Sequence, residues 1–151
     1  DVSVDSPTPG EVDVYPLLTG GTLPTTEIRQ QILEHLSDET IRPLTDYVQV
    51  LSPTAVNYEI VVDYWISRED SSRAAQIQAA VTDAVEQYRL WQQGKIGRDI
   101  TPGKLSALVF NAGASRIDAA TMKPAAFQAL EAKQVAQCTK VTVNYKGYKD
   151  E

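Results

Sequence analysis

The sequence predicts an α+β domain in which about three helices pack on a mixed, mostly antiparallel sheet. Its 151 residues, 42% of them hydrophobic and 23% charged, are typical of one globular domain. Segments with apolar residues at every second position alternate with segments at helical spacing. Two neighbouring strand segments are separated by residues 52–55, where Ser52 and Pro53 make a turn, which predicts an antiparallel hairpin. We therefore expect residues 1–151 to form a single α+β domain.

The first part of the chain predicts two short strands followed by a helix. Val2 and Val4 alternate with polar residues, residues 6–10 contain two prolines and a glycine, and residues 12–18 resume an extended pattern. Thr25 is a suitable N-cap for the helix that follows. The apolar face of this helix consists of residues spaced by four: Ile28, Ile32 and Leu36.

Residues 47–51 and 56–66 have the clearest strand pattern. The second segment alternates without a break, so one of its faces should be buried. The inward row is Val56, Tyr58, Ile60, Val62, Tyr64 and Ile66. The outward row is mostly polar and should be solvated: Asn57, Glu59, Val61, Asp63 and Trp65.

Val61 and Trp65 are the apolar exceptions in the outward row. A second layer of the same domain could cover them, and isolated apolar residues on a surface need no special explanation. The alternative is that they form an interface with a partner protein, since Trp is enriched at interface hot spots. The sequence leaves both explanations open.

The second half of the chain predicts two more helices and two more strands. Residues 73–93 carry a helical stripe, and a shorter helix over 102–112 has an N-cap, a first-turn proline and a hydrophobic staple: Thr101, Pro102, and Ile100 with Leu105. Residues 115–119 and 141–145 are predicted strands. Residues 124–136 are compatible with a helix, a loop or a short strand, because their composition favours a helix but they lack a sustained apolar stripe.

Charge and absent motifs narrow the range of functions. Twenty acidic and 14 basic residues give a net charge of −6, so nucleic acid is not an expected partner. No stretch reaches the roughly 18 consecutive apolar residues of a membrane span, so a membrane is not expected either. His35 and Cys138 are the single residues of their types and form neither a metal-ligand set nor a nucleophile–base pair. We expect no cofactor, no metal, no small-molecule substrate and no enzymatic activity.

Two polar clusters lie at predicted junctions between elements. Arg42 and Asp46 stand in RPLTD, between the first helix and the next strand, and Arg98 and Asp99 stand in GRDI, between the second and third helices. Arg and Asp at such junctions satisfy exposed backbone groups and pair with each other, so we expect a structural role. A ligand-binding role is the alternative, because Arg forks also suit carboxylates and phosphates.

The same clusters, with the series PTPGEVDVYPLL and GRDITPGKL, resemble the C-terminal part of the baseplate J-like proteins, which are assembly proteins of contractile phage tails and related injection machines. The resemblance runs from Asp1 to near Gly147, with RPLTD as its most specific piece. It implies a structural, non-enzymatic protein of the virion tail baseplate, assembled in the host cytoplasm. It implies contacts with other baseplate wedge proteins and leaves contacts with copies of itself open. It further implies that the chain is the C-terminal part of a longer protein and that the four junction residues specify the fold.

A small-ligand-binding regulatory domain is the main alternative function. Compact α+β folds often serve that role, and fold alone does not separate it from assembly. A ligand-binding domain should present a pocket with converging polar groups, whereas an assembly module should present broad surfaces.

Overall fold

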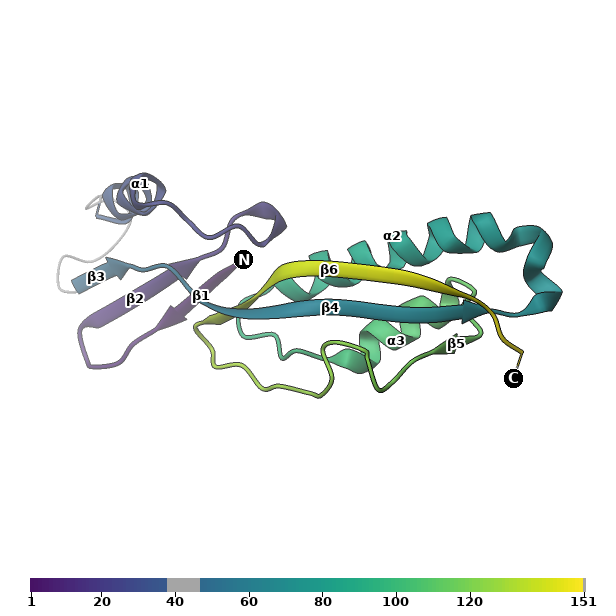
Figure 1. The fold of residues 1–151 in the computed structure, drawn as a ribbon. Coiled ribbons are helices and arrows are strands. Elements are labelled where there is room, and N and C mark those ends of the chain that lie inside the picture. Colours follow the sequence, from purple (N-terminus) through teal and green to yellow (C-terminus); the bar gives the residue numbers. More distant parts are fainter. Residues whose placement is uncertain (38–46, 151) are drawn as a thin grey trace.

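The computed structural model describes residues 1–37 and 47–150. Two three-stranded sheets lie one after the other along an elongated molecule (Figure 1), and three helices accompany them. This confirms the α+β class. No helix within the described residues is long and apolar enough to cross a bilayer.

The first sheet contains β1 (Val2–Asp5), β2 (Glu11–Pro16) and β3 (Tyr47–Val50), in that order. The expected pair of short strands is an antiparallel hairpin, with Val4 opposite Val14, whereas β2 and β3 are parallel. Helix α1 (Thr26–Leu36) packs on β3. Its predicted N-cap is confirmed, because the Thr25 hydroxyl accepts a 3.3 Å hydrogen bond from the Ile28 N–H.

The second sheet has the long strand β4 (Thr54–Ile66) at its centre, between β5 (Arg116–Ile117) and β6 (Gln134–Tyr148). Strand β4 is antiparallel to β5 and parallel to β6 along nearly its whole length. After a 3-10 segment (Arg68–Arg73), helix α2 (Ala74–Gln93) runs along this sheet, and α3 (Pro102–Asn111) packs against α2. Both predicted helices are therefore confirmed, but the predicted capping by Thr101 is wrong, because its hydroxyl donates to the Asp99 carbonyl oxygen and makes no capping bond.

The predicted hairpin between residues 47–51 and 56–66 is wrong. Strand β3 belongs to the first sheet and β4 to the second, so Ser52 and Pro53 connect two sheets instead of turning one strand back on the other. The strands also form two mixed sheets, and the longest ladder is parallel. Alternation of apolar residues specifies which face of a strand is buried, and carries no information about which strand lies beside it.

The core lies between the inward face of β4 and helices α2 and α3. The inward row from Tyr58 to Ile66 is buried, as predicted, against the helical stripe Ile77, Val81, Val85 and Tyr88. The staple residues Ile100 and Leu105 are also fully buried. A smaller cluster joins the first sheet to the second: Tyr15, Leu17, Ile96 and Val135.

Residues 118–133 form an irregular segment, with single bridges from Lys123 to Val61 and from Gln128 to Ile100. Of the three structures left open for residues 124–136, the loop is therefore the one adopted up to residue 133. The last strand begins at Gln134 and is much longer than the predicted 141–145. Val61 therefore pairs with this segment through Lys123. No local pattern in the sequence predicted that contact.

Candidate interaction surface

The face of β4 that points away from α2 and α3 is the candidate interaction surface, and we call it the outer face. It carries Val61 and Trp65 on β4, and Lys140, Thr142, Asn144 and Lys146 occupy the same face of the parallel neighbour β6. This assignment follows from the register, since Val62, on the inward face, lies opposite Val143, and successive side chains alternate between faces.

Val61 and Trp65 are both half-buried, so neither of the two explanations left open by the sequence is excluded. The Trp65 ring lies 5.4 Å from the guanidinium carbon of Arg116 and 5.9 Å from the Lys149 ammonium nitrogen. Both distances suit cation–π attraction. The half-buried Trp65 ring thus has two exposed cations beside it.

Cations dominate this end of the outer face. Arg116, Lys146 and Lys149 are exposed, and within the described part of the chain none has a carboxylate oxygen within 4 Å. The ion pair on this face joins Lys123 to Glu59 at 3.2 Å. The surface around Trp65 is therefore positively charged although the whole chain is acidic.

Asp63 is a correction to the expectation that the outward row is solvated. Only 8% of this residue is exposed. The Asn144 amide donates a 2.7 Å hydrogen bond to one carboxylate oxygen, and the Thr121 hydroxyl donates a 2.8 Å bond to the other. These two bonds, the first contributing more, hold the pKa of Asp63 below its ordinary value. The carboxylate is therefore held in its ionised form by neutral donors from its own chain.

The hollow of about 630 Å³ beside this face bears on the ligand-binding alternative. It lies between β4 and residues 123–128. The charged residues among those that line it are Glu59 and Lys123, which are paired with each other. Neither charged group of the lining is therefore left unpaired, and Asn57 and Gln128 supply its remaining polar side chains.

The junction between α2 and α3 holds two of the predicted structural residues. The Arg98 guanidinium lies 4.3 Å from the centre of the Trp91 ring and donates a hydrogen bond to the Trp91 carbonyl oxygen. The Asp99 carboxylate accepts a 2.8 Å hydrogen bond from the Leu130 N–H. Both side chains contact backbone groups, and within this described junction they form no ion pair with each other. Arg42 and Asp46 lie in 38–46, outside the described residues.

The sequence reasoning missed Gln92, which is fully buried at the same junction. Its amide nitrogen donates a 2.9 Å hydrogen bond to the Asp99 carbonyl oxygen. Its amide oxygen accepts bonds from the Tyr88 hydroxyl at 3.1 Å and the Thr101 N–H at 3.2 Å. In the sequence, Gln92 stands in a polar stretch at a helix end and resembles a solvated residue. No pattern in the neighbouring sequence distinguished it from a solvated glutamine.

His35 and Cys138 are the remaining residues that could have carried chemistry. His35 is exposed in the last turn of α1. Cys138 is a half-buried free thiol, and burial raises its pKa. Among the described residues no group of three or more His, Cys, Asp or Glu side chains is arranged to hold a metal ion.

Comparisons with known proteins cover nearly the whole chain. The model of the baseplate J-like protein C-terminal domain matches residues 58–144, and the model of the baseplate J-like central domain matches residues 1–52. Baseplate protein J of Escherichia phage P2 is 28% identical over 144 residues, which is 95% of this chain and 46% of that protein. The chain thus spans about half the length of this curated relative.

Proposed function

The chain belongs to the baseplate J-like family, and from this premise we propose that it is a structural component of a contractile tail or injection-system baseplate, acting through protein–protein contacts rather than catalysis. Its partners are other baseplate wedge proteins and copies of itself, and it assembles in the host cytoplasm before joining the virion tail. The observation that carries the proposal is the match to two consecutive baseplate domains over most of the chain.

We place one partner contact on the outer face around Trp65 and Val61. Three features support this placement: an aromatic ring that is still partly exposed, flanking cations without carboxylate partners in the described chain, and a sheet face that no described helix covers (Figure 1). Large aromatic residues surrounded by polar groups commonly dominate binding energy. The complementary surface would be acidic and contain an apolar depression for the indole ring.

Replacing Trp65 by alanine tests this proposal. Trp65→Ala should leave the fold intact and weaken binding to the neighbouring wedge protein at least about fivefold, as expected for loss of a hot-spot residue worth more than about 1 kcal/mol. Titration calorimetry with the purified wedge protein measures the affinity, and electron microscopy of tails carrying the variant measures baseplate assembly. Circular dichroism checks the fold.

Tyr47→Ala is the matched control, because Tyr47 is an aromatic residue 60% exposed on the first sheet, away from the outer face. It should leave binding unchanged. Normal binding by Trp65→Ala would remove the outer face from the proposal. A saturable thermal shift with one class of small molecule would instead favour the ligand-binding alternative.

A further inference from the structure

Two open sheet edges have matching patterns. Strand β1 is an edge of the first sheet, and β6 is an edge of the second. An edge strand presents unpaired backbone groups on which another strand can form. We propose that β1 of one copy of this chain pairs antiparallel with β6 of a second copy. This inference rests on the proposed assembly function and names a second copy as one of its partners.

The backbone of β1 offers Val2 and Val4 to the open edge. Asp1 and Leu17 exchange two hydrogen bonds, of 3.0 and 2.8 Å, so they form a hydrogen-bonded pair across the β1–β2 hairpin. In an antiparallel ladder such pairs alternate with pairs that are not hydrogen-bonded to each other. Val2 and Val4 fall in the second kind, so their N–H and C=O groups point away from β2.

The backbone of β6 offers Val141 and Val143 in the same way. On β4, Val61 exchanges hydrogen bonds with Lys123 on the side away from β6, so Val62 faces β6. A residue in a parallel ladder bonds to the two residues that flank its partner. The partner of Val62 is Val143, whose own groups therefore point to the open edge. Within the described chain, residues 141–146 make no backbone hydrogen bond outside their ladder with β4.

One register satisfies both edges. Val4 opposite Val141 and Val2 opposite Val143 would be the hydrogen-bonded pairs. Ser3 would then oppose Thr142, and Asp5 would oppose Lys140. All three of Val2, Val4 and Val141 are exposed, at 59%, 62% and 43%. The pairing therefore covers exposed valines with valines on one face and joins opposite charges on the other.

Length and charge favour β1 over another β6 strand. Register shifts interrupt β6 near Thr139 and again after Tyr145, which leaves about the length of β1 between them. Two β6 edges paired antiparallel about Val143 would bring Lys140 against Lys146, and like charges directly opposite are destabilising. The Glu59 carboxylate beside Lys140 is taken by Lys123 at 3.2 Å, so the Lys140 ammonium is available to Asp5 of the second copy.

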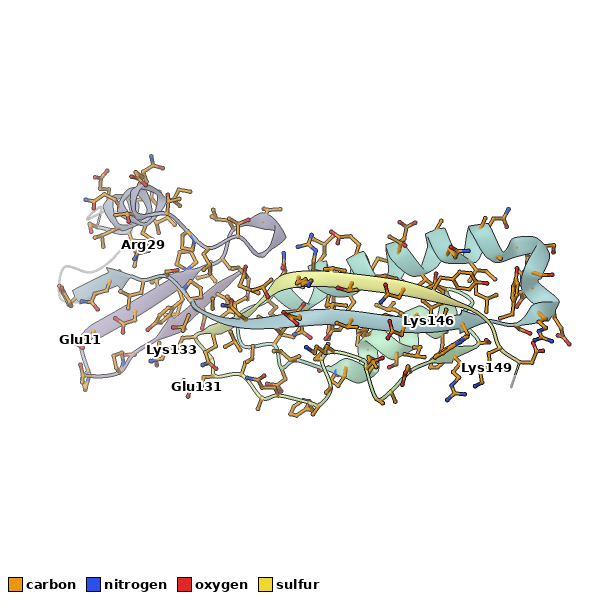
Figure 2. The ribbon with its side chains drawn as sticks, viewed as in Figure 1. Glu11, Arg29, Glu131, Lys133, Lys146 and Lys149 are labelled. Carbon is orange, nitrogen blue, oxygen red and sulfur yellow. The ribbon has the colours of Figure 1, made fainter. Side chains whose placement is uncertain are left out.

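Acidic and basic residues are distributed unevenly along the chain, and the part that contains β1 is the acidic one. Residues 1–52 contain nine acidic and two basic residues, whereas residues 53–151 contain eleven acidic and twelve basic residues. Figure 2 shows Glu11 at one end of the molecule and Lys146 and Lys149 near the other. A contact between different surfaces of identical chains is heterologous, so it repeats until a ring closes or a filament continues.

A charge exchange in the full 151-residue chain tests the pairing. Sedimentation equilibrium compares the wild type with Lys140→Glu, Asp5→Lys and the double variant. Each single change should weaken self-association roughly tenfold, because an attractive pair becomes repulsive, and the double variant should return to within about threefold of the wild type. Lys140→Arg keeps the charge and should associate as the wild type does. Circular dichroism verifies that each variant folds.

Disulfide trapping tests the register directly. Ser3→Cys on one chain and Thr142→Cys on another, both in a Cys138→Ser background, should form a mixed disulfide, because this pair would not be hydrogen-bonded and its side chains would lie close together. Ser3→Cys with Lys140→Cys is displaced by two residues and should crosslink far less.

Three results would overturn the proposal: a chain that stays monomeric at every concentration, self-association that the charge exchange does not alter, or equal crosslinking in both registers. Trp65→Ala should leave self-association unchanged, since Trp65 is outside the proposed pairing. Failure of the β1–β6 contact therefore leaves the test of the outer face standing, and the reverse also holds.

Discussion

Two buried polar side chains, Asp63 in β4 and Gln92 in α2, depend on hydrogen-bond partners for their stability. Asp63 and Gln92 are both nearly or fully inaccessible, and each has its side-chain oxygens satisfied by named donors. Burying such groups without partners would cost free energy, so their partners determine whether they stabilise the fold. The partners come from distant segments for Asp63 and from the next helix junction for Gln92.

Asp63 predicts a pH-dependent stability. Its pKa is lower in the folded protein than in the unfolded chain, so its contribution is present above the ordinary carboxyl pKa and is lost as the pH falls through the folded value. Asp63→Asn should lower the free energy of unfolding by about 1–2 kcal/mol at neutral pH, because charge-assisted hydrogen bonds from Asn144 and Thr121 are lost. Urea denaturation at a series of pH values measures this.

The difference between wild type and Asp63→Asn should shrink as the pH falls from the ordinary carboxyl pKa through the lower folded pKa, below which the wild-type residue is protonated too. Asp83→Asn is the control, because Asp83 is an exposed carboxylate on α2. It should change stability little at any of these pH values. A difference for Asp63→Asn that stays constant with pH would show that shape, and not charge, governs the site.

At the scale of elements, the 3-10 turn (Thr19–Gly21) packs against the end of α2. The Gln93 amide donates a 2.6 Å hydrogen bond to the Gly20 carbonyl oxygen, and the Gln137 amide donates a 2.8 Å bond to that of Gly21. Both glycines have positive φ, +80° and +79°. A Cβ on Gly21 would collide with the Gln93 carbonyl oxygen, whereas a Cβ on Gly20 would meet nothing within 4 Å.

These two glycines form a matched pair for mutation. Gly20→Ala should cost about 1–2 kcal/mol, from backbone strain alone. Gly21→Ala should cost more, roughly a further 1–3 kcal/mol, since overpacking adds to the same strain. Thermal denaturation of both variants measures the difference. Equal losses would mean that the turn moves away from α2 without penalty and that the close approach is unimportant.

At the scale of the whole molecule, two sheets share one small apolar cluster and several polar links. Tyr15 and Leu17 from the first sheet pack with Ile96 and Val135. The Asp1 carboxylate accepts a 3.0 Å hydrogen bond from the Ile96 N–H. Because buried contacts cross the boundary, unfolding of one sheet should expose apolar surface of the other.

The single-domain prediction therefore has a calorimetric test. Scanning calorimetry of the chain should show one transition whose calorimetric and van't Hoff enthalpies agree, as a cooperative unit requires. Gly21→Ala should lower the temperature of that transition without splitting it. Two separate transitions would show that residues 1–52 and 58–144, the segments matched by the two family models, unfold as independent domains.

The sequence by itself determined the local features of this protein. The capped helix after Thr25, the stapled helix after Thr101 and the buried row of β4 all follow from spacing within short windows, because capping and periodicity act between residues close in the chain. The class of function followed from the resemblance.

Only the tertiary structure decided how these elements meet. The parallel β4–β6 ladder and the separation of β3 from β4 were not predictable, because period-two alternation identifies a buried face without identifying a neighbouring strand. Asp63 looked solvated because its donors, Thr121 and Asn144, lie 58 and 81 residues away. Burial of a polar residue depends on such remote partners, and local sequence patterns contain no record of them.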